Sequence, residues 1–459
     1  MNITFIGGGS LRLLPILRGV FADNPATLEN SELRFYDLNV ERANDVATMV
    51  ASCPEFQSVN GCRVRVPETA EEALTGADVV YITMGIRRAP ENGYSIYASN
   101  RFGFISTDQL SISGGFLAVQ LGPVILDIAR KMEQYCPKAL MLIFANPVAV
   151  YSNMVNRYTK IRALGICGGF NNHRWDLTRL CGREAFDPEW NVVAAGVNHL
   201  SFILRGDYKG EDLYSSVMPK VLNENWKNIH AENPGGLQRS LGQLYTLYRK
   251  YGYLVFSTEL DGLYHLFPEE TVESQRNMVL PESEFDPEAA REKWFGNLNE
   301  QFRQFHEAAA SAETLDWDSM KGLLFDKNER DITIPILKAL AGIRKMRIVA
   351  SDVNRGVLNS LPEDAAVEYT MDLFKDQITP VENQFIPLPF KGVISCLSEH
   401  QTLLADAIAK QDPKLFAAAL DAYPIKQFTA DHRAVVRKHF EIYSSSLNET
   451  MKQAESYFC

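Results

Sequence analysis

The chain is poor in cysteine and in net positive charge, and both scarcities exclude classes of protein. Its 459 residues include seven cysteines, an odd number without a C-x-x-C pair. Neither a disulfide framework nor a zinc site of paired cysteines is therefore expected. The formal net charge of −11 argues against a broad basic surface, which nucleic-acid binding generally requires. We expect reduced thiols and no nucleic-acid partner.

Long hydrophobic runs are also missing. The N-terminus, MNITFIGGGS, has no basic segment followed by an apolar one, so it is not typical of a secretory signal. No segment offers the roughly 20 consecutive apolar residues of a membrane helix. We therefore expect a cytoplasmic protein with no membrane partner.

What the sequence does contain is an alternation of short apolar runs and amphipathic segments through its first 150 residues. This alternation is typical of βαβ units and predicts a parallel sheet. Helical spacing covers Val40–Ser52 and Gly115–Gln134. The runs that we interpret as strands are Ile3–Ile6, Leu33–Tyr36, Val79–Thr83 and Leu140–Phe144.

The second half is richer in long helical patterns, such as Glu282–Glu313 and Glu399–Leu420. We predict an α/β fold, with a Rossmann-type parallel-sheet domain at residues 1–190 and a mixed, helix-rich α+β domain at residues 191–459. No linker or internal repeat separates the two halves, so we expect them to pack closely, with a ligand site at their junction.

The first predicted strand runs into a glycine turn formed by Gly7, Gly8, Gly9 and Ser10. Glycines at this point let the backbone approach a dinucleotide pyrophosphate at the N-terminus of the following helix. An ordinary turn between a strand and a helix would have a similar composition. The turn therefore predicts a dinucleotide site only together with the residues that follow it.

Asp37 supplies that context, because it follows the second strand, 28 residues after Gly9. A carboxylate at this position can accept hydrogen bonds from the adenosine ribose and would repel a 2′-phosphate, which favours NAD over NADP. Alternatively, Asp37 caps the next helix. Asn39, Thr83 and Asn146 follow the same and neighbouring strands and complete the candidate cofactor contacts.

Six motifs carry a family resemblance: IGGGS at 6–10, YDLN at 36–39, ANPV at 145–148, GIC at 165–167, GVNHLSF at 196–202 and NRGVLNSLPEDAAVE at 354–368. In this order they resemble glycoside hydrolase family 4, which includes α-glucosidases, α-galactosidases, α-glucuronidases, α-galacturonidases and 6-phosphoglycosidases. The resemblance implies a Rossmann domain followed by a half similar to that of lactate and malate dehydrogenases. It also implies NAD⁺ and a divalent metal, commonly Mn²⁺, as cofactors, and homodimers or homotetramers.

The resemblance implies a glycosidase that recycles its nicotinamide cofactor. NAD⁺ removes a hydride from sugar C3, and the resulting ketone acidifies the proton on C2. A base abstracts that proton while the metal stabilises the enediolate, and the C1–oxygen bond breaks by elimination. Water then adds and NADH returns the hydride, so there is no net redox change.

In the family a cysteine and a histidine hold the metal, in motifs that match Cys167 and His199. A thiolate and an imidazole suit a borderline cation and leave coordination positions open. Without the motifs, the same residues would also suit a buried thiol and a structural histidine. Asn146 and Asn198 lie beside these motifs, and we expect them to contact sugar hydroxyls or the nicotinamide ribose.

The resemblance also points to the groups that move protons. Asp261 aligns with the base of the family's non-phosphorylated α-glycosidase branch, and Tyr264 is the second choice because other members use a tyrosine from this region. Asp-Gly at this point is equally typical of a turn. A position linked to leaving-group protonation follows the metal cysteine, where this chain has Gly168. Because glycine cannot donate a proton, we expect His173 or a water to replace it, unless the leaving group needs little help. His173 is equally consistent with a loop histidine.

Arginines near the fourth predicted strand bear on the substrate. Arg87, Arg88 and Arg101 suit an anionic group on the sugar, since a guanidinium binds carboxylate, sulfonate or phosphate through two hydrogen bonds. Surface ion pairs or the NAD pyrophosphate are alternative partners for them. The chain has QLSISGG at 109–115, where the 6-phosphoglycosidase branch has a longer glycine-rich stretch, and this argues against a phosphorylated sugar.

We therefore predict a hydrolase acting on a small-molecule glycoside, either an anionic one such as a uronide or sulfoquinovoside or a neutral α-glycoside. Three alternatives stay open at this point. A 6-phosphoglycosidase of the same family differs only in the substrate. A plain NAD-dependent 2-hydroxyacid dehydrogenase shares the Rossmann half and needs no metal, and an NAD-sensing protein would keep the fold without the chemistry.

Overall fold

A computed structural model gives the fold of the chain. It describes residues 1–85, 94–95, 98–99, 102, 104, 109–168, 177–178, 190–220, 248, 250–256, 287–322, 324–425 and 432–458.

The first half is built on a parallel sheet in the order β3-β2-β1-β4-β5-β6. Its strands are β1 (Asn2–Ile6), β2 (Glu32–Tyr36), β3 (Arg63–Arg65), β4 (Val79–Ile82), β5 (Leu140–Ile143) and β6 (Arg162–Gly165). The helices between them are α1 (Leu13–Asp23), α2 (Val40–Ser52), α3 (Ala70–Leu74), α5 (Ile112–Tyr135) and α6 (Val148–Tyr158). This strand order is that of a Rossmann fold, so the predicted fold of the first half is confirmed.

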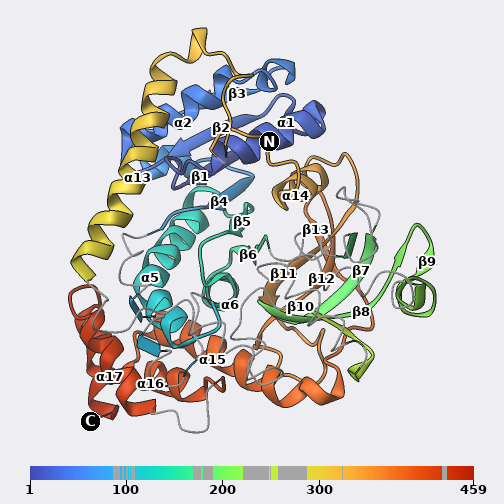
Figure 1. The fold of residues 1–459 in the computed structure, drawn as a ribbon, viewed down its shortest axis with the longest axis vertical. Helices are drawn as coiled ribbons and strands as arrows, with labels where there is room; N and C mark the ends of the chain where they lie inside the picture. The colour runs from blue at the N-terminus through green and yellow to red at the C-terminus, as the bar shows by residue number, and fades with distance from the viewer. Residues whose placement is uncertain are drawn as a thin grey trace.

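The second half continues the same sheet with antiparallel strands. These are β7 (Trp190–Val197), β8 (Leu200–Tyr208), β9 (Glu211–Asp212), β10 (Leu254–Phe256), β11 (Met346–Val353), β12 (Ala366–Phe374) and β13 (Gln377–Pro380). Strand β11 pairs with β6, and the order then runs β11-β12-β7-β8-β10. Within the described residues one sheet of thirteen strands thus crosses the molecule (Figure 1).

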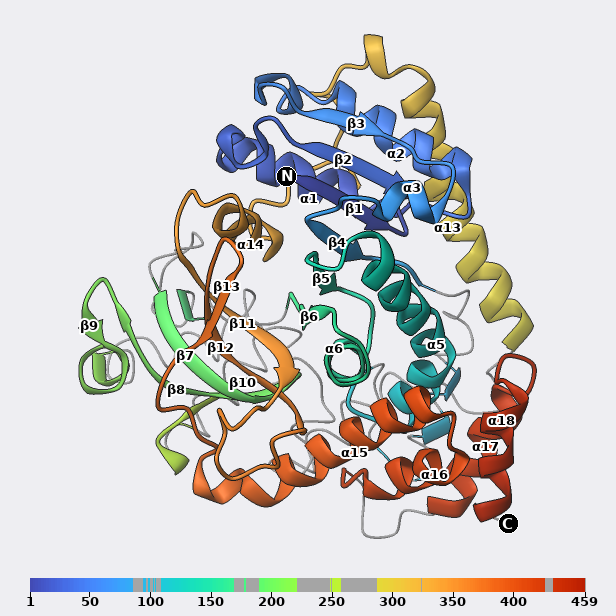
Figure 2. The same ribbon diagram turned by 180° about the vertical axis from the view of Figure 1, so that it is seen from behind.

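Most of the later helices gather at the C-terminal end of the molecule, and Figure 2 shows them from behind. The later helices are α13 (Pro287–Ala310), α14 (Thr333–Leu340), α15 (Lys391–Lys410), α16 (Pro413–Ala422), α17 (His432–Ile442) and α18 (Glu449–Lys452), and those from α15 onward form this group. The single helix expected at 399–420 is wrong. Gln411 adopts a left-handed φ of 53° and ends α15, and the Asp412 side chain accepts a hydrogen bond from the Lys414 N–H to begin α16.

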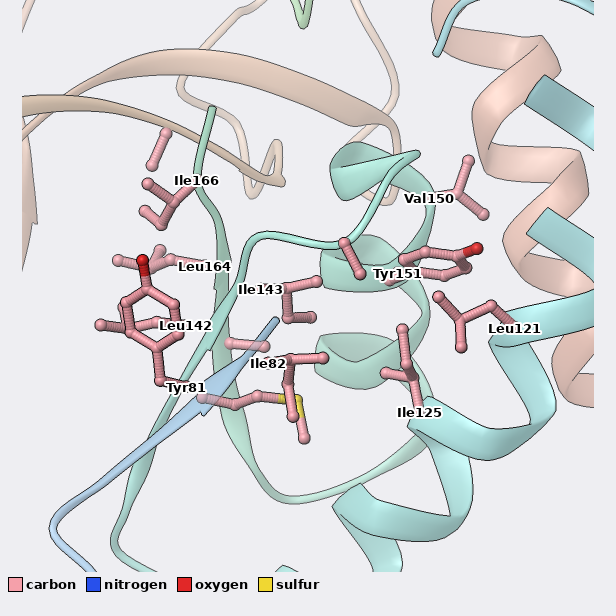
Figure 3. Packing of buried hydrophobic residues seen from close by; sticks show 14 of the residues in the cluster. Tyr81, Ile82, Leu121, Ile125, Leu142, Ile143, Val150, Tyr151, Leu164 and Ile166 are labelled. Carbon is pink, nitrogen blue, oxygen red and sulfur yellow. The ribbon is translucent and has the colours of Figure 1, made fainter. Parts of the chain in front are cut away.

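Buried side chains fill the space between the central strands and two helices (Figure 3). Ile82 and Ile143 are paired across β4 and β5, and they face Tyr151 of α6 and Ile125 of α5. All four are almost completely buried. This packing fixes the strands whose ends carry the candidate cofactor residues.

Helix α5 corrects one expectation from the sequence. By length and composition it is apolar enough to cross a membrane, although no such segment was expected. However, 72% of its most apolar window is buried inside the protein, which is typical of a core helix. The helix packs against α15 and α6.

Candidate functional site

One row of paired residues crosses the sheet and relates the candidate site residues to one another. The row consists of Tyr36, Ile6, Ile82, Ile143, Gly165, Ser351, Glu368, Gly196 and Ser201. Every described candidate lies within four residues of one of these positions. For the parallel strands, this places them beyond the carboxyl ends, where open α/β sheets bind ligands.

The glycine turn after β1 has no room for side chains. Gly7 has a φ of +87°, and a Cβ there would lie 2.7 Å from the backbone N of Met84. A Cβ on Gly8 would lie 2.6 Å from the backbone N of Tyr36. The N–H groups of Gly7 and Gly8 both donate to the Tyr36 carbonyl, at 3.0 and 2.9 Å. These two glycines therefore provide close backbone packing, while their own amides bond within the protein.

Asp37 links the glycine turn to the end of β2. Its Oδ2 accepts the Gly9 N–H at 3.0 Å and its Oδ1 accepts the Asn39 N–H at 2.9 Å. The helix cap is a different residue, because the Asn39 side chain accepts the Arg42 N–H at 3.0 Å and begins α2. The alternative role of Asp37 as the cap is therefore wrong. The half-buried carboxylate keeps lone pairs for ribose hydroxyls.

The other cofactor candidates lie at the same edge of the parallel sheet, beyond the carboxyl ends of its strands. Thr83 follows β4, and its hydroxyl donates to Ser10 Oγ at 3.4 Å. Asn146 follows β5, is half-buried, and is joined to Pro147 by a cis peptide bond at the start of α6. The structure thus groups Ser10 and Thr83 with the glycine turn and sets Asn146 at the end of the next strand.

The side chains of Cys167 and His199 meet, although Cys167 follows β6 and His199 lies in the β7–β8 turn. The Cys167 Sγ and the His199 Nε2 are 3.4 Å apart. Thiolate and imidazole ligands of one metal, at about 2.3 Å and about 2.1 Å from it, lie about 3.1 to 3.6 Å apart for bond angles near about 90–109°. The pair therefore fits two ligands of one cation, and it equally fits a thiol–imidazole hydrogen bond.

Two protein donors alone would leave a metal mostly open. Within the described ranges, no group of three or more His, Cys, Asp or Glu side chains is placed to hold a metal. Catalytic metal sites characteristically keep positions for substrate or water. Cys167 is half-buried and Gly168 is exposed, so the pair lies at the boundary between core and solvent.

The turn that carries His199 is tight and strained. Asn198 and His199 connect β7 and β8 across the pair Val197 and Leu200. His199 has a φ of +69°, a left-handed conformation that costs a non-glycine residue energy and often occurs at functional sites. A Cβ on Gly196 would lie 2.3 Å from the carbonyl oxygen of Leu200. Glycine is therefore required for the strands to approach so closely.

A residue that the sequence interpretation did not assign, Glu368, lies behind this turn. Its Oε2 accepts a hydrogen bond from Asn198 Nδ2 at 2.9 Å. Burial raises the pKa of the Glu368 carboxyl, and the hydrogen bond from Asn198 and the nearby His199 only partly oppose that effect. Glu368 is the last residue of the motif at 354–368. The motif could be recognised in the sequence, but it did not indicate what Glu368 does.

The candidates for acid, base and anion recognition lie outside the described residues. They are Arg87, Arg88, Arg101, His173, Asp261 and Tyr264. Their roles stay predictions, and the structure brings together the cofactor and metal candidates only.

Comparison with known proteins adds to this geometry. The model for family 4 glycosyl hydrolases matches residues 2–180, and the model for the C-terminal domain of that family matches residues 194–425. The α-galactosidase of Bacillus subtilis (strain 168) is 26% identical over 440 residues, which cover 92% of this chain and 93% of that enzyme. The α-galacturonidase of Thermoanaerobacter italicus is 23% identical, with 96% of each chain covered.

A solved structure shows the same fold. It is that of a 6-phospho-alpha-glucosidase from gut microorganisms in complex with NAD and Mn²⁺, with a TM-score of 0.77 at 18% identity, covering 97% of this chain and 98% of that one. The likeness extends over both halves of the molecule.

Proposed function

The chain belongs to family 4 of the glycosyl hydrolases, and from this membership we propose that it hydrolyses a glycoside with NAD⁺ and a divalent metal such as Mn²⁺ as its cofactors. The 6-phospho-alpha-glucosidase of the same fold was solved with both. The observation that carries the proposal is the 3.4 Å separation of Cys167 Sγ and His199 Nε2, which suits a shared metal beside a Rossmann-type cofactor site.

The bound cofactors would supply reversible oxidation at sugar C3 and electrostatic stabilisation of the charge that develops when C2 loses its proton. The residues of the chain would bind and orient the cofactors and the sugar. The glycine turn and the start of α1 would lie against the dinucleotide, and Asp37 would offer oxygens to the adenosine ribose. Cys167 and His199 would hold the metal, and Asn146 and Asn198 would contact sugar hydroxyls.

For the substrate we propose an α-linked sugar without phosphate, either anionic or neutral. Two relatives along nearly the whole chain are named as an α-galactosidase and an α-galacturonidase, and the segment at 109–115 departs from the 6-phosphoglycosidase pattern. Arg87 and Arg88 would bind a carboxylate or sulfonate on C6 if the sugar is anionic. A panel of nitrophenyl α-galactoside, α-galacturonide and 6-phosphoglucosides, assayed with Mn²⁺ and NAD⁺, ranks these classes by kcat/KM.

The decisive test follows the hydrogen on sugar C2. In D₂O the released sugar should carry deuterium at C2, because the proposed route removes that proton and later restores one from solvent. NAD⁺ should act catalytically, with no accumulation of NADH. A dehydrogenase would instead form NADH in step with substrate consumed. Free sugar without deuterium at C2, or NADH in step with substrate, would contradict the proposal.

We also propose a homodimer or homotetramer in the cytoplasm. Both follow from the family resemblance and from the sequence rather than from any contact in the structure. Light scattering on the purified chain measures the oligomeric state.

A further inference from the structure

The buried carboxyl of Glu368 has no part in the function proposed so far. It belongs to β12, where it is paired with Gly196 of β7 and with Ser351 of β11. Only 6% of Glu368 is exposed. The Glu368 side chain reaches the turn after β7, where it contacts Asn198. The side chains of Ser201 and Ser351 help to oppose the rise that burial causes in the pKa of its carboxyl.

The hydrogen bond between Asn198 and Glu368 fixes which way the Asn198 amide points. The Nδ2 donates to Glu368 Oε2 at 2.9 Å, so the carbonyl oxygen Oδ1 must point elsewhere. Asn198 is only 2% exposed, and its Oδ1 has no hydrogen-bond partner among the residues that the structure describes. Buried acceptors are nearly always satisfied, so this oxygen suits a donor from a bound ligand.

The same contact supports the strained residue next in the chain. His199 follows Asn198 and has the left-handed φ of +69°. An amide anchored to a buried carboxyl holds the first residue of the two-residue turn in place. A turn held in this way keeps the His199 imidazole where it meets Cys167.

We propose that Glu368 is a positioning residue that orients the Asn198 amide, so that Asn198 Oδ1 accepts a hydrogen bond from a substrate hydroxyl and His199 stays in place for the metal. The hydroxyl part of this inference depends on the proposed glycoside substrate. The part that concerns His199 does not, and it can be tested without turnover.

The first experiment exchanges donor and acceptor. Asn198→Asp alone brings a second carboxylate against Glu368, and kcat/KM should fall by about 100-fold because two buried carboxylates repel. Adding Glu368→Gln gives an amide that donates to the new carboxylate and leaves its other oxygen facing the ligand. The double variant should recover kcat/KM at least tenfold over Asn198→Asp. If the fold-loss of kcat/KM in the double variant equals the product of the losses in Asn198→Asp and Glu368→Gln, the proposal is overturned.

The second experiment uses Co²⁺ alone, with absorption from the thiolate–metal bond as the signal. Glu368→Gln keeps an acceptor for Asn198 and should bind Co²⁺ within about threefold of the original affinity. Glu368→Leu removes the acceptor and should weaken binding about tenfold or more, with NAD⁺ affinity unchanged. Equal Co²⁺ affinity in Glu368→Leu and the original protein would overturn the positioning role.

Thr370→Val is the matched control for a merely structural effect. Thr370 lies two residues along β12, is fully buried, and bonds to the backbone of Ala194 through its hydroxyl at 2.7 and 2.8 Å. The variant should lower the melting temperature yet leave Co²⁺ binding unchanged. Weakened Co²⁺ binding in this variant, matching that of Glu368→Leu, would show that any loosening of β12 has the same effect and would overturn the proposal. If the original protein binds Co²⁺ but hydrolyses no glycoside, the proposed function and the hydroxyl part of this inference fail, while the part that concerns His199 stands.

Discussion

The proposed metal site requires the side chains of Cys167 and His199 to approach each other, and their Sγ and Nε2 atoms lie 3.4 Å apart. We expect Cys167→Ser and His199→Ala each to abolish metal-dependent turnover, because a hydroxyl or a methyl group replaces a ligand that borderline cations favour. The NAD⁺ affinity should stay within about threefold, since the glycine turn and Asp37 are on other strands. Equilibrium binding of Mn²⁺ and of NAD⁺ to each variant measures the two effects separately.

Cys62 provides the control for that prediction. It is half-buried like Cys167, and burial raises the pKa of its thiol to about 11. It lies beside β3 and has no histidine as a described hydrogen-bond partner. Cys62→Ser should therefore bind Mn²⁺ normally. Unchanged activity in both Cys167→Ser and His199→Ala would remove the metal-site assignment.

The burial of His439 should make the stability of the protein depend on pH. It is fully buried, and its Nε2 lies 3.1 Å from Ser99 Oγ while its Nδ1 lies 2.8 Å from the Val435 carbonyl oxygen. Burial lowers the pKa of His439 to about 4. Between about pH 6.5 and about pH 4 the unfolded chain therefore binds a proton that the folded chain does not, so the folded state loses stability as the pH falls.

We expect His439→Gln to reduce that pH dependence. From pH 7 to pH 5 the His439 proton should account for about 2 kcal/mol of lost unfolding free energy, and urea titrations at both pH values measure the difference. His306→Gln is the contrasting control, because the hydrogen bond to Asp45 raises the pKa of the exposed His306. Its removal should make the loss on acidification larger, and a shift of the same sign in both variants would contradict this account.

These residues also mark how far the sequence could predict the site. Cys167, His199 and Asn198 were identifiable because each lies inside a short motif. Glu368 ends such a motif, but its role depends on strand pairing with Gly196, which no local pattern encodes. His439 is surrounded by helical spacing alone, so nothing in the sequence distinguishes its buried ring from an exposed one.

At the scale of elements, helices and strands with a strong local pattern could be predicted from the sequence, and those with a weak pattern were missed. Helix α2 begins and ends where periodicity placed it, at Val40–Ser52, and Asn39 supplies its cap. Strand β3 has only three residues, two of them exposed, which is too short for a period to be recognised. The break between α15 and α16 was missed because apolar spacing continues across it, although Pro413 marks the new helix start.

The glycine turn is the element that most sharply limits substitution. A Cβ on Gly8 would lie 2.6 Å from Tyr36 N and 2.7 Å from Phe35 Cα, and backbone atoms cannot move aside as a side chain can. We expect Gly8→Ala to lower the free energy of unfolding by about 1–3 kcal/mol and to weaken NAD⁺ binding at least about tenfold. Urea unfolding and NAD⁺ titration measure the two effects.

Gly392 in α15 is the matched control, because a Cβ there meets nothing within 4 Å. Gly392→Ala should keep or slightly raise stability, since alanine restricts the unfolded chain more than glycine. A Gly8→Ala variant with normal stability and normal NAD⁺ binding would show that β1, β2 and the turn can separate without cost.

At the scale of the whole molecule, a continuous sheet joins the two family domains. The predicted boundary at residues 190 and 191 stays a prediction. Across the two halves, β6 of the first pairs directly with β11 of the second. Asp352 of β11 reinforces this joint. It is fully buried and accepts hydrogen bonds from Arg162 of β6 at 2.5 and 2.7 Å and from the Tyr369 hydroxyl of β12 at 2.7 Å.

The last prediction concerns this joint. Burial raises the pKa of Asp352, but the hydrogen bond and charge of Arg162 outweigh that effect and leave the pKa below its usual value, so the native residue is a carboxylate. Asp352→Asn leaves the Arg162 charge without its counterion, which costs about 3–5 kcal/mol in a buried pair. Because one third of the Arg162 side chain is exposed, we expect about 3 kcal/mol, measured by urea unfolding. Asp127→Asn, which breaks an exposed pair with Lys131 on α5, should change nothing measurable. A loss below about 1 kcal/mol in Asp352→Asn would mean that this buried pair contributes little to joining the two halves.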